Sequence, residues 1–210
     1  MIDKNPITNK FSYWFVKRFL DVIFSIILII TLFPFLMLIS LLIMIFNGLP
    51  VYYSWRVHGF QGKEFVGYKF RTMILSADKM KDQYLDKNEM SGPVFKIKND
   101  PRITRAGKLF RKYSIDELPQ LWSVLKGDMS LVGPRPPLKS EWEHYEEWQK
   151  RKLSVKPGLT CLWQISGRNM ISDFNDWINL DLKYIDNWSL LLDIKILFKT
   201  IPTVLKGTGK

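Results

Sequence analysis

The chain has 210 residues and a formal net charge of +11, with 31 Lys and Arg against 20 Asp and Glu. This length allows one globular domain together with a membrane segment, and this charge favours anionic partners: nucleic acid, phosphorylated substrates or an anionic membrane surface. The only cysteine, Cys161, excludes a disulfide framework and a cysteine-based metal site within one chain, and His58 and His144 are too far apart in sequence to indicate a zinc site.

The first predicted element is an apolar segment over residues 22–46, which contains no charged residue. As a straight helix it would be about 38 Å long, more than the roughly 30 Å of bilayer hydrocarbon. The alternative, a buried helix of a soluble protein, needs a larger domain than this chain provides. We therefore predict a membrane segment over residues 1–50.

Pro34 lies at the middle of this segment, where its ring removes a hydrogen bond and kinks the helix. Basic residues flank both ends and would hold both on the cytoplasmic face; they are Lys10, Lys17 and Arg18 before it and Arg56, Lys63, Lys69 and Arg71 after it. This distribution favours a re-entrant helix hairpin with its kink at Pro34. A simple kinked anchor that crosses the bilayer is the alternative.

The rest of the chain predicts a mainly α fold with a small β element, of the α+β class. We expect a strand pair within residues 51–75 and a solvated helix over 76–90. Further helices are expected at 103–113, 118–126, 138–152 and 173–187, with a short extended piece at 130–132 and a turn at 155–158. These elements define a second domain over residues 51–187.

Residues 188–210 mix apolar side chains with Lys195, Lys199 and Lys206. An apolar helix with lysines along its edge can lie in the membrane interface, and the alternative is a helix that packs on the core. We treat these residues as a third unit, an interfacial amphipathic helix.

Asp116 and Glu117 are adjacent carboxylates in a strongly basic stretch, which suggests phosphate or metal chemistry. Ser114 and Glu117 fit a capping box, in which Glu117 would be structural. Pro119 favours a different start, because proline prefers the first position of a helix. A helix that begins at Pro119 would place both carboxylates just before its N-terminus, where the dipole and free amides favour negative charge. Both interpretations stay open at this point.

Arginines supply the complementary charge. Arg135 lies between Pro134 and Pro136, whose fixed backbone angles would present its guanidinium with little entropy to lose. Such an arginine suits bidentate phosphate recognition, and a stiff surface loop is the alternative. Arg111 ends a run of cations spaced three residues apart, which is either a solvated helix face or part of a phosphate site.

Several motifs together resemble the bacterial sugar transferases, the monotopic polyprenyl-phosphate phosphoglycosyl transferases. They occupy residues 17–21, 67–73, 114–121, 125–136, 156–160 and 163–168, in the order of the family. The chain resembles the small form of this family, the catalytic domain without extra transmembrane helices. Two positions differ from the usual pattern: Phe33 replaces the serine that often precedes the kink proline, and Cys161 replaces a glycine.

The resemblance implies a two-step reaction. Asp116 would attack the β-phosphate of a UDP-sugar, release UMP and hold the sugar phosphate covalently. Polyprenyl (undecaprenyl) phosphate would then take the sugar phosphate and so initiate assembly of a capsule, exopolysaccharide, O-antigen or other glycan. Glu117 would assist Asp116, or share with it a magnesium ion held also by the substrate phosphates. Phosphate or uridine contacts are assigned to Arg135, Lys69, Arg71, Arg111 and Arg168.

The expected cofactor is Mg²⁺, and the expected partners are a UDP-sugar, polyprenyl phosphate and membrane lipids, without nucleic acid. Homo-oligomerisation is left open. The expected location is the bacterial inner membrane, with the domain over 51–187 acting on the cytoplasmic face. The competing hypothesis is a membrane-anchored basic binding protein without chemistry. It explains the charge and the anchor but not the paired carboxylates or the proline-framed arginine.

Overall fold

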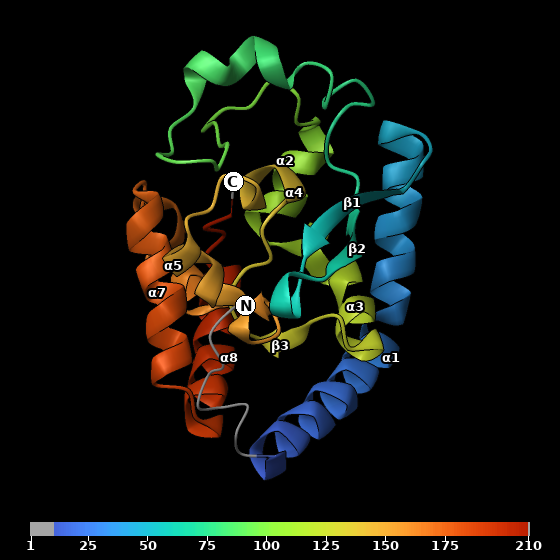
Figure 1. Cartoon of the computed structure of the whole chain (residues 1–210). Coiled ribbons are helices and arrows are strands. Elements are labelled where there is room, and N and C mark those ends of the chain that lie inside the picture. Colours follow the sequence, from blue (N-terminus) through green and yellow to red (C-terminus); the bar gives the residue numbers. More distant parts are fainter. Residues whose placement is uncertain (1–10, 210) are drawn as a thin grey trace.

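The computed structural model describes residues 11–209 (Figure 1). Helix α1 (Phe11–Asn47) contains Pro34 and stays a single helix across it. Figure 1 shows that its two halves run in different directions, as expected for a proline inside a helix. Within the described residues, Trp14–Asn47 is long and apolar enough to cross a membrane, and only 11% of its most apolar part is buried. A core helix would be mostly buried, so that alternative is excluded, while the re-entrant course stays a prediction.

The predicted strand pair is confirmed. Strand β1 (Tyr52–His58) pairs antiparallel with β2 (Glu64–Phe70), and a short helical turn, η1 (Phe60–Gly62), connects them. A second small sheet pairs β3 (Ser130–Val132) in parallel with β4 (Gly158–Thr160), so the extended piece at 130–132 is also confirmed. The turn expected at 155–158 leads into β4.

The helices follow in chain order. The structure has η2 (Lys81–Lys87), α2 (Arg105–Lys112), η3 (Ile115–Gln120), α3 (Leu121–Lys126), α4 (Lys139–Trp142), α5 (Glu147–Lys150), η4 (Arg151–Ser154), α6 (Leu162–Ile165), η5 (Arg168–Met170), α7 (Phe174–Asp186) and α8 (Leu190–Leu205). The helices predicted at 103–113 and 173–187 correspond to α2 and α7. With two small sheets among many helices, the structure agrees with the α+β class.

Two segments that we predicted as continuous helices have a different structure. Residues 76–90 form turns and the 3₁₀ helix η2, in which no residue is buried. Without a packed apolar face, a charged α-helix has little to stabilise it. The helix predicted at 138–152 is broken into α4, α5 and η4. The break occurs because Tyr145 turns into an aromatic cluster with Trp142 and Phe174, while Gln149 accepts a bond from the backbone N–H of Glu146 and so starts α5.

The core lies between the small sheets and the C-terminal helices. One cluster joins α3, β3, α7 and α8 through Val124, Val132, Ile185 and Ile196. Ile196 is fully buried, so α8 packs on the core along one face, as the alternative interpretation of residues 188–210 requires. The opposite face of α8 exposes large apolar side chains, which are Leu191, Ile194, Phe198, Ile201 and Leu205.

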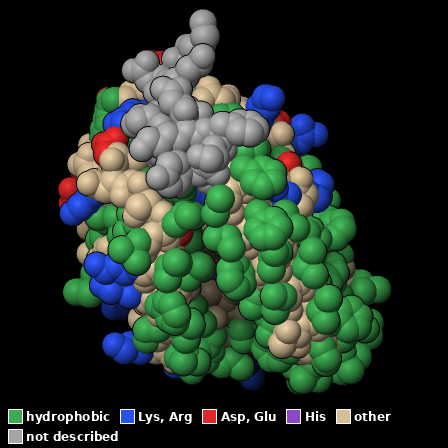
Figure 2. All heavy atoms as spheres, turned by 90° about the horizontal axis from the view of Figure 1, so that it is seen from below, with side chains coloured by type: hydrophobic (Ala, Val, Ile, Leu, Met, Phe, Trp, Pro, Cys, Tyr) green, Lys and Arg blue, Asp and Glu red, His purple; other side chains and the backbone are tan. Residues whose placement is uncertain are grey.

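An apolar surface covers the lower end of the molecule (Figure 2). It lies on the side where Figure 1 shows the first half of α1 and the lower end of α8. Phe15 and Phe19 of α1 are more than half exposed, like Phe198 of α8. This surface suits a membrane boundary, and the interfacial placement of α8 stays a prediction.

Candidate active site

The dipeptide Asp116–Glu117 lies in the first turn of η3, and both predictions of its local structure are wrong. Pro119 does not begin a helix but lies inside η3, and the side chain of Ser114 makes no capping hydrogen bond. The 3₁₀ turn forms because the backbone N–H of Glu117 bonds the Ser114 carbonyl at 3.2 Å. Ser114 has a left-handed backbone (φ 53°), and its hydroxyl accepts a bond of 3.0 Å from Arg168 instead.

The two carboxylates have different surroundings. Glu117 accepts a hydrogen bond of 2.8 Å from Lys69 Nζ, which forms an ion pair across β2 and η3. The Lys69 ammonium also lies 5.0 Å from the centre of the Trp55 ring on β1, a cation–π distance. Asp116 is buried, and it has no salt bridge within the described part of the chain. Its carboxylate is therefore the one left available for a substrate.

This difference separates the acidities of the pair. Burial and the negative charge of Glu117 raise the pKa of Asp116 to about 6, against the pull of Lys69 and Arg111. Burial acts in the same direction on Glu117, but the charges of Lys69 and Arg168 outweigh it and lower the pKa of Glu117 to about 2. At neutral pH both groups are ionised, and Asp116 is the more basic of the two.

The carboxylates open into a cavity of about 380 Å³. Every cation assigned to the site from the sequence also lines it, and these are Lys69, Arg71, Arg111, Arg135 and Arg168. They come from β2 and the residue directly after it, from α2 and η5, and from the segment after β3. The fold therefore brings together residues that are up to 99 positions apart, from Lys69 to Arg168. Aromatic residues form much of the remaining wall, among them Tyr53, Trp55, Trp163 and Trp177.

Arg135 is held by a rigid segment. Gly133 and Gly158 lie back to back: a Cβ on Gly133 would overlap the Lys156 carbonyl, and one on Gly158 would overlap the Gly133 nitrogen. The Gly158 N–H also bonds the Pro134 carbonyl at 2.9 Å. The Arg135 guanidinium then lies 5.3 Å from the centre of the Trp177 ring. The glycines and prolines of this motif therefore fix the direction of one side chain.

Arg111 and Arg71 have protein partners of their own. Arg111 Nε donates to the Thr72 hydroxyl at 2.8 Å, and burial lowers the pKa of its guanidinium. Arg71 donates to the carbonyls of Leu49 at 2.9 Å and Gly48 at 2.6 Å, and also to that of Asn47. Arg71 thus ties the end of α1 to β2, a function that the sequence did not indicate. Contacts of these arginines with phosphate stay predictions.

The structure also contains two ion pairs that the sequence did not predict. Lys152 and Asp181 form a buried ion pair of 2.7 Å beside Trp177. Lys17, a flanking charge and the first residue of the motif at 17–21, pairs with Asp193 of α8 at 2.6 Å. The partners are 29 and 176 positions apart, so no local pattern could have revealed either pair.

The residues fit a magnesium ion of the substrate-bridged kind. The described residues contain no group of three or more His, Cys, Asp or Glu that could hold a metal. Mg²⁺ usually keeps several waters and binds through one or two carboxylates together with substrate phosphates. Asp116 and Glu117 could supply carboxylate ligands of that type. The Lys69 hydrogen bond uses only one of the two Glu117 oxygens.

Comparison with known proteins identifies the family of the chain. The family model described as bacterial sugar transferase matches residues 12–207, and the chain belongs to that family. It is 49% identical to "Galactosyl transferase CpsE" of Streptococcus agalactiae over 95% of its length and 44% of that protein. It is 43% identical to "Undecaprenyl-phosphate galactose phosphotransferase" of Salmonella typhimurium, over 95% of its length and 42% of that protein.

A shorter relative matches nearly end to end. The chain is 40% identical to "Exopolysaccharide production protein ExoY" of Sinorhizobium fredii, over 92% of its length and 87% of that protein. By contrast, it spans less than half the length of the Streptococcus and Salmonella proteins. The matched part therefore contains the family's shared domain.

Proposed function

We propose that the protein transfers a sugar 1-phosphate from a UDP-sugar to a membrane polyprenyl phosphate and releases UMP. The observation that carries the proposal is a buried carboxylate, Asp116, on a cavity lined by six cationic side chains, the five assigned from the sequence and Lys96. The name of the Salmonella relative supports the acceptor and the class of group transferred. The reaction would begin assembly of a capsule, exopolysaccharide, O-antigen or other surface glycan. A basic binding protein would need no such carboxylate, and family membership favours the enzyme.

In the first step an Asp116 oxygen attacks the β-phosphorus of the donor. The new bond joins that oxygen to phosphorus, and the bond from phosphorus to the bridging oxygen of the diphosphate breaks, so UMP leaves with the electron pair. A carboxylate nucleophile thereby divides one difficult displacement into two. Asp116 suits this task because its raised pKa makes it the more nucleophilic carboxylate of the pair.

In the second step a phosphate oxygen of the polyprenyl phosphate attacks the same phosphorus and frees the Asp116 carboxylate. Both steps gather negative charge on phosphoryl oxygens, which preorganised cations stabilise. Lys69, Arg111, Arg135 and Arg168 line the cavity in the position to do so. Glu117 holds Lys69 in place through their ion pair, and bound magnesium would supply further charge neutralisation of the diphosphate.

Helix α1 supports a membrane location for this chemistry. The cavity wall includes Pro50, three residues after the end of α1 at Asn47. A lipid phosphate at the membrane surface would therefore have a short path to Asp116. We place the protein at the bacterial inner membrane, with the cavity on the cytoplasmic face, where nucleotide sugars are available.

The test is UMP release by the detergent-solubilised protein with magnesium, polyprenyl phosphate and a panel of UDP-sugars. We expect release with at least one sugar and its loss in Asp116→Asn, which keeps the shape of the side chain but not its charge. Asp186→Asn is the matched control, because Asp186 pairs with Arg151 and does not line the cavity. Without acceptor, intact-mass analysis should show one sugar phosphate on the wild-type chain and none on Asp116→Asn. No UMP release from any donor would refute the proposal.

A further inference from the structure

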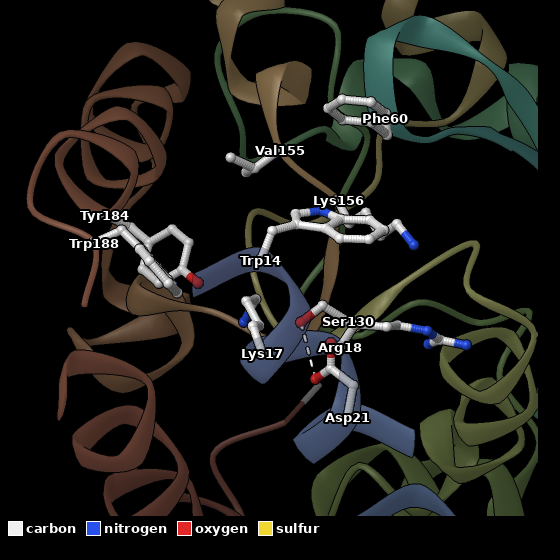
Figure 3. A pocket seen from close by; sticks show the side chains of 10 residues that line it. All are labelled: Trp14, Lys17, Arg18, Asp21, Phe60, Ser130, Val155, Lys156, Tyr184 and Trp188. Carbon is white, nitrogen blue, oxygen red and sulfur yellow. Dashed lines mark hydrogen bonds between the residues drawn. The ribbon is translucent and has the colours of Figure 1, made fainter. Parts of the chain in front are cut away.

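The N-terminal end of α1 contacts β3 through two charged side chains. Lys17 and Asp21 are four residues apart and so lie on one face of the helix. The Asp21 carboxylate accepts bonds from the Leu131 N–H at 2.9 Å and from the Ser130 hydroxyl at 3.1 Å. Figure 3 shows Asp21 against Ser130, with Lys17 on the same helix and Arg18 directed to the other side.

Lys17 completes the contact at the next residue of the strand. Its ammonium donates to the Val132 carbonyl at 3.0 Å and to Asp193 of α8 at 2.6 Å. The Tyr184 hydroxyl bridges the same two groups, at 3.1 Å from the Val132 carbonyl and 2.7 Å from Asp193. All three residues of β3 therefore have a polar bond to α1, and they are buried.

Strand β3 depends on these contacts for its position. It has only three residues, and its one partner strand, β4, is equally short. A two-stranded sheet is marginal on its own and needs packing against other elements. Hydrogen bonds that involve a charged carboxylate or a charged ammonium are among the stronger ones that could hold the strand in place.

Arg135 follows β3 after only two residues. Gly133 bonds the Thr160 carbonyl at 3.0 Å, Pro134 is fixed by its ring, and Gly158 bonds the Pro134 carbonyl. This connection is short and rigid, so a shift of β3 moves the backbone of Arg135 by a similar amount. The guanidinium 5.3 Å from the Trp177 ring would then leave its place in the cavity wall.

We propose that Lys17 and Asp21 are positioning residues that hold Arg135 in the active site through β3. The docked membrane helix is thereby a part of the catalytic machinery and not only an anchor. The inference rests on the proposed function only for the role of Arg135 toward phosphate. The claim that α1 fixes the positions of β3 and of the Arg135 segment is supported by the hydrogen bonds alone.

The first test is hydrogen–deuterium exchange of the solubilised full chain. In Asp21→Ala we expect faster amide exchange in peptides covering residues 130–137, and in Asp21→Asn, which retains an acceptor, an intermediate rate. Arg18→Met is the matched control: Arg18 donates to the Val124 and Leu125 carbonyls of α3 at 2.6 and 2.7 Å, and so ties the same helix to a different element. Unchanged exchange at 130–137 in both Asp21 variants would overturn the proposal.

The second test is a double-mutant cycle with Arg135→Lys, measured as UMP release. Loss of bonds to a charged group predicts a fall of about tenfold for Asp21→Ala. If Asp21 acts through Arg135, we expect a fall of less than about twofold in the Arg135→Lys background, whereas Arg18→Met should have the same effect in both backgrounds. Equal tenfold losses in both backgrounds would show a merely structural role. An inactive wild type would refute the proposed function, and the exchange experiment would still decide the positioning claim.

Discussion

Two lysine–carboxylate pairs in this protein have almost the same geometry and opposite surroundings. Lys69 and Glu117 are 2.8 Å apart on the cavity wall, with side chains 22% and 18% exposed. Lys152 and Asp181 are 2.7 Å apart, with side chains 2% and 1% exposed. Trp177 separates the second pair from the cavity, since it contacts both Lys152 and Arg135.

Distance alone therefore does not distinguish a structural ion pair from a functional one. The Lys152 pair is sealed among aromatic rings, including Tyr145, and no ligand can share its charges. The Lys69 pair lies next to Asp116 and faces open space, so its charge can act on a phosphate. We therefore expect the first pair to affect stability and the second to affect rate.

The largest effect should follow removal of the buried lysine. Lys152→Met leaves the Asp181 charge unpaired in the core, and we expect a loss of about 3–5 kcal/mol in the free energy of unfolding. Urea unfolding of the detergent-solubilised protein, followed by circular dichroism, measures it. Lys150→Met is the matched control, because Lys150 pairs with the exposed Glu147 and such pairs contribute about 1 kcal/mol or less.

A double replacement tests whether the unpaired Asp181 charge causes this loss of stability. Lys152→Met combined with Asp181→Leu removes both charges, and well-packed apolar residues often replace a buried pair without loss. We expect most of the lost stability to return. Equal destabilisation by Lys150→Met and Lys152→Met would contradict the structural role assigned to the buried pair.

Removal of the cavity lysine should act on rate instead. Lys69→Met deletes one cation facing the phosphoryl group, and losing one such preorganised group costs on the order of 10²–10³ in rate. The pair is partly solvated, so we expect the free energy of unfolding to change by about 1 kcal/mol or less. UMP release and urea unfolding on the same sample measure both, with the exposed Lys63→Met as control. A variant that kept its rate but unfolded easily would reverse the assignment of the two pairs.

The sequence predicts local elements and short motifs well, and contacts between distant elements poorly. The apolar segment, the strand pair and helices α2 and α7 follow from composition and periodicity, which are local properties. The predicted site residues line one cavity, and the sequence could indicate them because the motifs that carry them are short and local. The proline-framed Arg135 is an example. These residues could be named without knowing how β2, η3 and η5 meet.

The features that the sequence does not predict depend on long-range contacts. The sequence favours a helix that begins at Pro119 without excluding a capping box at Ser114, yet η3 includes Pro119, because the 3₁₀ bonds begin at Ser114. The roles of Lys17 toward β3 and of Lys152 toward Asp181 exist only once distant elements have packed. Charged residues of this kind look like solvated surface until the fold is known.

The smallest expected effect is a pH dependence of the first chemical step. Asp116 attacks only when ionised, and its pKa is raised to about 6, so formation of the covalent intermediate should fall as pH decreases through 6. Single-turnover experiments without acceptor, at pH values from 5 to 8, would measure this acidic limb.

Two variants should move the limb in opposite directions. Lys69→Met removes a charge that lowers the pKa of Asp116, so the limb should shift to higher pH. Glu117→Gln removes the like charge that raises it, so the limb should shift to lower pH. Asp186→Asn, outside the cavity, should leave it unchanged. If both active-site variants kept the wild-type limb, the titrating group would not be Asp116, and the contrast between the two lysine pairs would lose its electrostatic basis.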